Sequence, residues 1–100
     1  EAYAMDEMLR VKLGALTECA REMQSALEEY EAAANEAQSA AQALGDEWKG
    51  AARDAFVAEQ ARAYQAHGML ANAIRQMLRG VKDAIVNYRE TENKVRNAIQ

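Results

Sequence analysis

Few side chains in this 100-residue sequence have the types and spacing that catalysis or metal binding requires. His67 is the only histidine, and no serine, cysteine or second histidine stands at helical spacing from it to form a nucleophile–base pair. Glu28, Glu29 and Glu31 form an acidic run, but no Glu-x-x-His sequence accompanies it, so a di-metal site is unsupported. We therefore expect no enzymatic activity, no cofactor and no metal ion, with His67 at a buried or interfacial position.

The composition indicates an all-α fold in a single domain, residues 1–100. Proline is absent, and alanine, glutamate, glutamine, arginine, leucine and methionine, which favour helices, are frequent. The net charge is −4 and the basic residues do not cluster, so we expect no nucleic-acid partner. Cys19 is the only cysteine, which permits no internal disulfide, and we expect a buried free thiol.

Targeting and membrane segments are not visible in the sequence. No stretch approaches the ~20 apolar residues of a membrane-spanning helix, so we expect no stable membrane insertion. No N-terminal basic segment is followed by an apolar run, so we expect no cleaved Sec signal peptide.

The first half of the chain carries one uninterrupted apolar seam. Its positions alternate in steps of four and three, which is the heptad pattern of a packed helix. They are Leu9, Leu13, Leu16, Ala20, Met23, Leu27, Tyr30, Ala34, Ala37, Ala41 and Leu44. Because the last part of this seam is mostly alanine, a partner helix can approach closely there.

The second half repeats the pattern with a broader stripe. Its seam comprises Phe56, Gln60, Ala63, His67, Leu70, Ile74, Met77, Val81, Ala84, Tyr88, Thr91 or Glu92, and Val95. Further apolar positions widen one flank, namely Val57, Tyr64, Ala71, Leu78, Ile85 and Ile99. A stripe of this width indicates a helix that contacts more than one neighbour.

Glycines separate the two seams and predict a hairpin. Gly45 suits the left-handed residue that ends a helix, Asp46 can cap the following turn, and Gly50 lets the chain re-enter a helix. We expect helix one at about 5–44, a bend at 45–50 and helix two at about 51–97. Gly68 and Gly80 fall within helix two, where close helix contacts would account for them.

A lone hairpin of this kind buries too little apolar surface to offset the entropy of ordering its residues. Two antiparallel hairpins side by side would complete the broad stripe as a four-helix bundle. The halves also differ in charge, because residues 1–46 carry ten acids and three bases whereas residues 47–100 carry six and nine. We therefore expect two long antiparallel helices in each chain, and a dimer of chains.

The only tryptophan, Trp48, lies within the predicted bend. Trp48 could simply plug the end of a bundle. The tripeptide Trp48-Lys49-Gly50, midway along a proline-free helical hairpin of this length, resembles the WXG family, the early-secreted-antigen-like substrates of bacterial type VII (ESX) secretion. The family also has a C-terminal Tyr-x-x-x-Asp/Glu export motif, and this sequence has Tyr88-Arg-Glu-Thr-Glu92.

The longer family pattern continues this motif with hydrophobic residues, here Val95 and Ile99. The spacing places Tyr88, Glu92, Val95 and Ile99 on one helical face. Tyr88 and Val95 would also continue the apolar seam, but an acid at position 92 is not what a seam requires. We refer to Trp48, Gly50, Tyr88, Glu92, Val95 and Ile99 as the export motif.

The resemblance implies a non-enzymatic protein exported as a folded dimer through a type VII system, as a secreted effector or a co-secreted partner. It implies that the bend of one chain lies near the C-terminal helix of the other, where a secretion ATPase would read both. Polar Gln60 and His67 in the seam leave open whether the partner is a second copy, which we favour, or a paralogous WXG-type protein. Two alternatives are a targeting partner or chaperone of a larger type VII toxin, and an intracellular helical adaptor.

Overall fold

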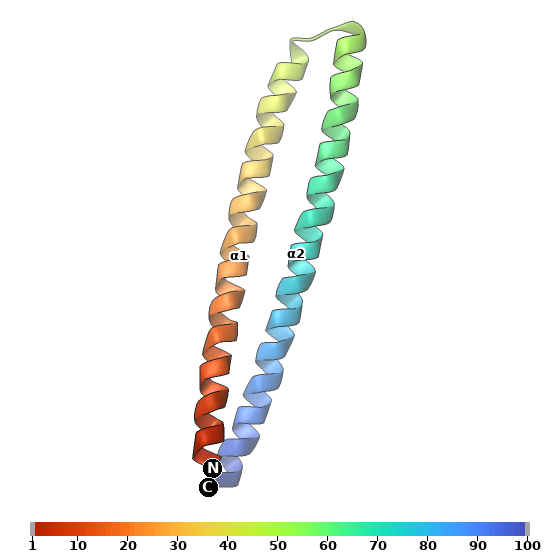
Figure 1. The fold of residues 1–100 in the computed structure, drawn as a ribbon. Coiled ribbons are helices and arrows are strands. Elements are labelled where there is room, and N and C mark those ends of the chain that lie inside the picture. The colour runs from red at the N-terminus through yellow and green to blue at the C-terminus, as the bar shows by residue number, and fades with distance from the viewer. Residues whose placement is uncertain (1, 100) are drawn as a thin grey trace. The chain divides into compact units, whose positions relative to one another are not determined.

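The computed structural model describes residues 2–99, which form two long helices. Helix α1 comprises Ala2–Asp46 and helix α2 comprises Gly50–Ile99, with residues 47–49 between them (Figure 1). Residues 2–99 contain no strand. The all-α helical hairpin is confirmed, and both helices extend beyond the bounds of about 5–44 and 51–97 that we expected.

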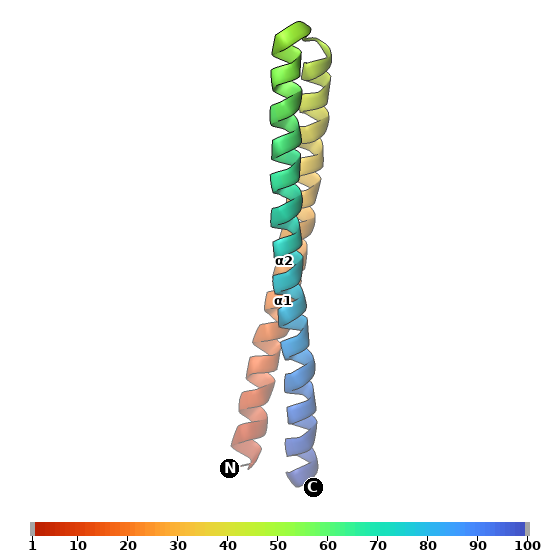
Figure 2. The ribbon, with the colours of Figure 1, turned by 90° about the vertical axis from the view of Figure 1, so that its right-hand side faces the viewer.

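The hairpin divides into two compact units. Unit 1 contains the N-terminal part of α1, up to Ser25, and the C-terminal part of α2, from Gln76. Unit 2 comprises Ala26–Arg75 and therefore includes the bend. In each unit one segment of α1 and one of α2 lie side by side and run in opposite directions (Figures 1 and 2).

The core of unit 1 is small and consists of aliphatic side chains. Ala20 of α1 and Leu78 and Ile85 of α2 are buried. Four half-buried side chains pack against them, namely Leu13, Leu16, Met23 and Val81. These residues come from the two predicted seams and their flank, so the heptad pattern is what pairs the helices here.

Unit 2 has a thinner core that changes in character toward the bend. Leu27 and Ala71 are its most buried side chains, and Glu31 and Arg75 form an ion pair between the helices at 2.5 Å. Nearer the bend, the half-buried side chains of α1 are two alanines, Ala34 and Ala41, and Gln38. Small side chains bury little area, so this part of the hairpin has little apolar surface holding it together.

The buried stripe of α2 lies on the predicted flank rather than along the whole predicted seam. Leu70 is 51% exposed, and Met77 is also exposed, whereas their neighbours Ala71 and Leu78 are buried. Successive residues of a helix point about 100° apart, so a shift of one position exchanges a buried side chain for an exposed one. On α1 the seam is buried or half-buried from Leu9 to Ala34, and the exposed members are Ala37 and Leu44.

Two smaller expectations are wrong. Cys19 is an exposed free thiol, because it precedes the buried Ala20 and is turned away from α2. Gly68 and Gly80 mark no close contact within the described residues, since a Cβ at either position would meet nothing within 4 Å.

Candidate functional site

The bend is a tight connection whose backbone is hydrogen-bonded to the end of α1. The amide of Glu47 donates to the carbonyl of Leu44, and the amide of Trp48 donates to the carbonyl of Gly45, both at 3.1 Å. Each of these hydrogen bonds joins an amide to the carbonyl three residues before it. Bonds of this 3₁₀ type tighten the last turn and satisfy carbonyls that a helix end would leave free. Trp48 is therefore placed by the backbone at the end of α1.

Gly50 starts the second helix as we predicted, whereas Gly45 does not have the role that we predicted for it. Gly45 lies within α1 and has no left-handed backbone, so it does not end the helix as expected. Gly50 has a φ of 71°, the only positive φ in the described chain, and α2 begins there. The left-handed residue thus starts the second helix, a conformation that glycine adopts without a Cβ clash.

Gly45 provides the space for an aromatic pair. A Cβ at Gly45 would lie 3.0 Å from the ring of Phe56, so the ring sits directly on the α1 backbone. Trp48 packs edge-on against the same ring, with centroids 4.9 Å apart and an interplanar angle of 62°. This geometry is a favourable aromatic arrangement, and it fixes the indole against α2.

Arg53 ties the first turns of α2 back to the end of α1. Its Nη1 donates to the carbonyl of Gly45 at 3.0 Å and lies 3.7 Å from the carboxylate of Asp46. Asp46 is part of α1 and so does not cap α2 as predicted. We call Gly45, Trp48, Arg53 and Phe56 the bend cluster. Arg53 is not among the residues predicted from the sequence, because its partners Gly45 and Asp46 belong to the preceding helix.

The C-terminal residues of the export motif face α1 in unit 1. Glu92 is buried, at 8% exposure, while the hydrophobic members are half-buried, namely Tyr88, Val95 and Ile99. Trp48 and Gly50 belong to unit 2. Within a single chain, the two parts of the motif are therefore carried by different units.

Glu92 has partners that account for an acid within the seam. Its Oε1 accepts a hydrogen bond from Arg96, and the Nε of Arg10 on α1 lies 3.9 Å from the same oxygen. Arg10 also pairs with buried Asp6, at 3.0 Å. We call Asp6, Arg10, Glu92 and Arg96 the terminal ion cluster. The sequence offered a signal for Asp6, which is an acid seven residues before Leu13 in the seam of α1.

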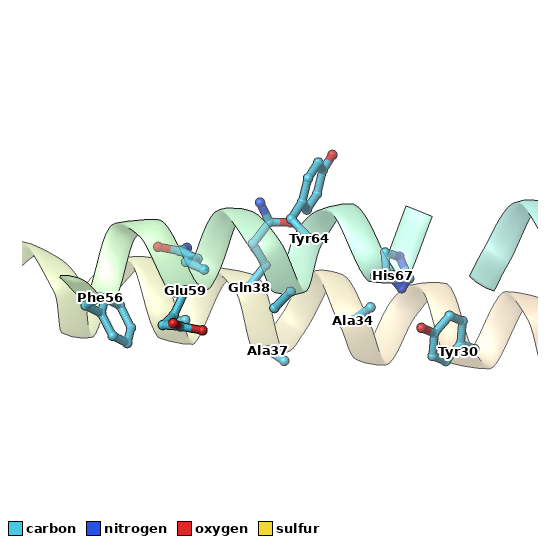
Figure 3. A pocket seen from close by; sticks show the side chains of 11 residues that line it. Tyr30, Ala34, Ala37, Gln38, Phe56, Glu59, Tyr64 and His67 are labelled. Atoms are coloured by element: carbon cyan, nitrogen blue, oxygen red, sulfur yellow. The ribbon is translucent and has the colours of Figure 1, made fainter. Parts of the chain in front are cut away.

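Unit 2 contains a groove of about 410 Å³ between its two helices. The α1 side is lined by Tyr30, Ala34, Ala37, Gln38 and Ala41, and the α2 side by Phe56, Glu59, Gln60, Ala63, Tyr64 and His67. Figure 3 shows Phe56 at one end and Tyr30 beside His67 at the other, while Tyr64 points away from α1. The small alanine side chains leave the space that this groove occupies.

His67 lies at the end of the groove without a polar partner for one of its nitrogens. Its ring is 4.7 Å from that of Tyr30, centroid to centroid, and its Nδ1 is buried and makes no hydrogen bond to any described residue. A buried polar atom without a partner is unfavourable in the isolated chain. This histidine is half-buried at the helix interface, within the range that we expected.

Neither helix formed by residues 2–99 combines the length and apolar character needed to cross a membrane. No three side chains of the histidine, cysteine, aspartate or glutamate types gather there in a way that could hold a metal ion.

The geometry of the bend agrees with what comparison with known proteins finds. The family WXG100, described as proteins of 100 residues with WXG, matches residues 8–93. No curated protein and no solved structure matches the sequence significantly. WXG100 proteins are small, non-enzymatic helical proteins of type VII secretion systems, and they typically pair with one another. With Trp48-Lys49-Gly50 at the bend of a helical hairpin and a match over most of its length, this chain belongs to the WXG100 family.

Proposed function

We propose that this protein is exported as a folded dimer by a type VII secretion system and acts as a secreted effector or as a co-secreted partner. The observation that carries the proposal is the placement of Trp48. Trp48 is 39% exposed, yet its ring packs against Phe56 and its backbone amide is hydrogen-bonded to the carbonyl of Gly45. An aromatic side chain that is held rigidly but not covered is suited to contact with another protein, because little side-chain entropy is lost on binding.

The recognition surface in this proposal combines two chains. The bend of one chain, with Trp48 and Gly50, would lie near the C-terminal part of α2 in its partner. There the secretion ATPase would recognise the indole together with Tyr88 and Glu92. The aromatic pair would supply contact area, and the acid would orient a basic group of the ATPase.

A second copy of the chain is the favoured dimer partner. Large apolar side chains remain uncovered on α2 in the single chain, among them Tyr64, Met69, Leu70 and Met77. The alanine-lined groove of unit 2 offers a complementary depression on the same hairpin. Burying both would supply the apolar area that the thin intramolecular core lacks.

A paralogous WXG-type protein, or the helical domain of a larger type VII toxin, is the second candidate partner. The buried Nδ1 of His67 favours it, because this atom has no hydrogen-bond partner among residues 2–99. A different chain could supply the missing hydrogen bond and so be selected over a second copy. In that case the protein would serve as a targeting partner or chaperone.

Export from the native host tests the proposal. Tagged wild type, Trp48→Ala and Glu92→Gln would be quantified in culture supernatant and in cell lysate, with folding checked by circular dichroism. Tyr3→Ala and Glu18→Gln are matched controls, because they change an exposed aromatic side chain and an exposed acid outside both the export motif and the proposed dimer surface. The expected result is export of wild type and both controls, with the folded motif variants retained in the cell. Retention of wild type itself would instead support an intracellular adaptor.

A further inference from the structure

The acid of the export motif is held by the chain's own arginines. Arg96 lies one turn after Glu92 on α2 and donates to its Oε1, while Arg10 approaches the same oxygen from α1. Arg10 in turn is bound to Asp6. The side chains of Glu92 and Asp6 are only 11% exposed, whereas those of Arg10 and Arg96 are 60% and 43% exposed. The acids therefore lie between the helices and the arginines cover them.

Each acid in this cluster is only half satisfied. Oε2 of Glu92 and Oδ1 of Asp6 are buried and have no hydrogen-bond partner in the described structure. Removing a carboxylate oxygen from water without giving it a hydrogen-bond donor is unfavourable. Losing or gaining a partner for a buried carboxylate therefore changes the local stability strongly. The buried aliphatic core of unit 1 lies elsewhere, around Ala20 and Leu78. Leu9 is the buried apolar side chain of α1 in the turns that carry the ion cluster, and it lies outside that core.

We propose that the terminal ion cluster is an intramolecular clasp that withholds Glu92 from its receptor until the first turns of α1 separate from α2. This inference rests on the proposed function, in which Glu92 is the acid read during export. The receptor it implies is a protein surface that presents an arginine or lysine. Such a group would replace Arg10 and Arg96 and would donate to the oxygen that has no partner in the closed chain.

Two substitutions should shift the equilibrium between the closed and the open clasp in opposite directions while leaving Glu92 intact. Arg10→Gln removes the cation shared by two acids, so the closed state loses its interhelix ion pair and gains repulsion between carboxylates. Asp6→Leu removes an unsatisfied acid, extends the apolar seam by one heptad before Leu13, and leaves Arg10 to Glu92 alone. Arg21→Gln is the matched control, because Arg21 is an exposed arginine of unit 1 that pairs only within its own helix, with Glu18.

Amide hydrogen exchange measures the clasp independently of export. We expect Arg10→Gln to speed exchange in residues 88–99 by about 2- to 5-fold, the upper range for loss of a solvent-exposed ion pair, and Asp6→Leu to slow it. Arg21→Gln should leave exchange in that segment unchanged. In the native host, the fraction exported should rise for Arg10→Gln and fall for Asp6→Leu.

The outcomes separate failure of the clasp from failure of the proposed function. If Glu92→Gln abolishes export but Arg10→Gln and Asp6→Leu export as wild type does, the clasp is refuted and the export role of Glu92 stands. Equal exchange rates in all variants would also refute the clasp. If Glu92→Gln is exported normally, Glu92 is not read during export, and the inference falls together with that part of the proposed function.

Discussion

At the scale of single residues, the bend depends on two glycines for two different physical reasons. Gly50 is needed for its backbone conformation, because φ is 71° and nothing lies within 4 Å of a Cβ built there. Gly45 is needed for space, because its backbone is helical and the Phe56 ring occupies the position of a side chain. Substitutions at the two positions should therefore have different signatures.

Gly50→Ala should lower the free energy of unfolding by about 1–2 kcal/mol, the cost of a left-handed conformation in an L-residue. Gly14→Ala is the control, since Gly14 lies within α1 with open space around it. That substitution should raise the free energy of unfolding by up to about 1 kcal/mol, the difference in helix propensity. Urea unfolding followed by circular dichroism measures both. Stabilisation by Gly50→Ala would contradict the geometry described for the bend.

Gly45→Ala should displace Phe56 and, through it, Trp48. Overpacking of this kind costs about 1–3 kcal/mol, and the indole should lose its contact with the ring. Because Trp48 is the only tryptophan, its fluorescence reports this site directly, and we expect a shift of the emission maximum to longer wavelength. Gly68→Ala, which meets nothing within 4 Å, should leave the emission unchanged. An unchanged spectrum in Gly45→Ala would show that the indole does not depend on Phe56.

At the scale of the helices, α2 carries two adjacent apolar stripes with different tasks. One stripe contains Leu78 and Ile85 and is buried against α1 in unit 1. The other contains Leu70 and Met77 and is exposed in the single chain. In the proposed dimer the exposed stripe would contact the partner. The buried stripe would then stabilise the folded hairpin, and the exposed stripe would stabilise the dimer.

Leu78→Ala should lower the free energy of unfolding by about 2–4 kcal/mol, because Leu78 is 5% exposed within the core cluster. Leu70→Ala makes the same chemical change at a position that is half exposed in the single chain. We expect it to weaken self-association and to change the unfolding of the dissociated chain by less than about 1 kcal/mol. Denaturation at two protein concentrations distinguishes the two effects. Equal losses for both variants at high dilution would contradict the division into stripes.

The elements themselves follow from the sequence, whereas the choice between neighbouring stripes does not. Absence of proline, helix-forming composition and the seam from Leu9 to Leu27 predict α1 directly. On α2, apolar residues occupy both 70/77 and 71/78, so hydrophobicity alone does not select the register that faces α1. The partner helix decides it, because only one stripe can meet the seam of α1.

The candidate site was predictable to a similar degree. The position of Trp48 at the bend follows from the sequence, because a glycine stands on each side of it between the two seams. The packing of Phe56 on Gly45 and the pairing of Arg10 with Glu92 depend on contacts between residues far apart in the chain. No local pattern specifies such contacts. The acids Asp6 and Glu92, which fall in the apolar register, indicate only that the seam contains charge.

At the scale of the whole molecule, the single domain over residues 1–100 and the dimer stay predictions. Both units have thin cores, and in the proposed dimer the chain would gain much of its stability from association. Its thermal midpoint should therefore rise with protein concentration, as mass action requires for a dimer that dissociates on unfolding. Scanning calorimetry across a wide concentration range, with sedimentation equilibrium for the mass, measures this. A midpoint independent of concentration, together with the mass of one chain, would contradict a homodimer.

The central claim, that export reads Trp48 of one chain together with Glu92 of its partner, is tested most directly by complementation between variants. Trp48→Ala and Glu92→Gln chains would carry different tags and be produced in the same native host cells. A mixed dimer then holds one intact pair, Trp48 from the Glu92→Gln chain and Glu92 from the Trp48→Ala chain. The account predicts that both tagged chains appear together in the supernatant, although neither is exported alone. Mixed dimers that form in the lysate but never leave the cell would contradict it.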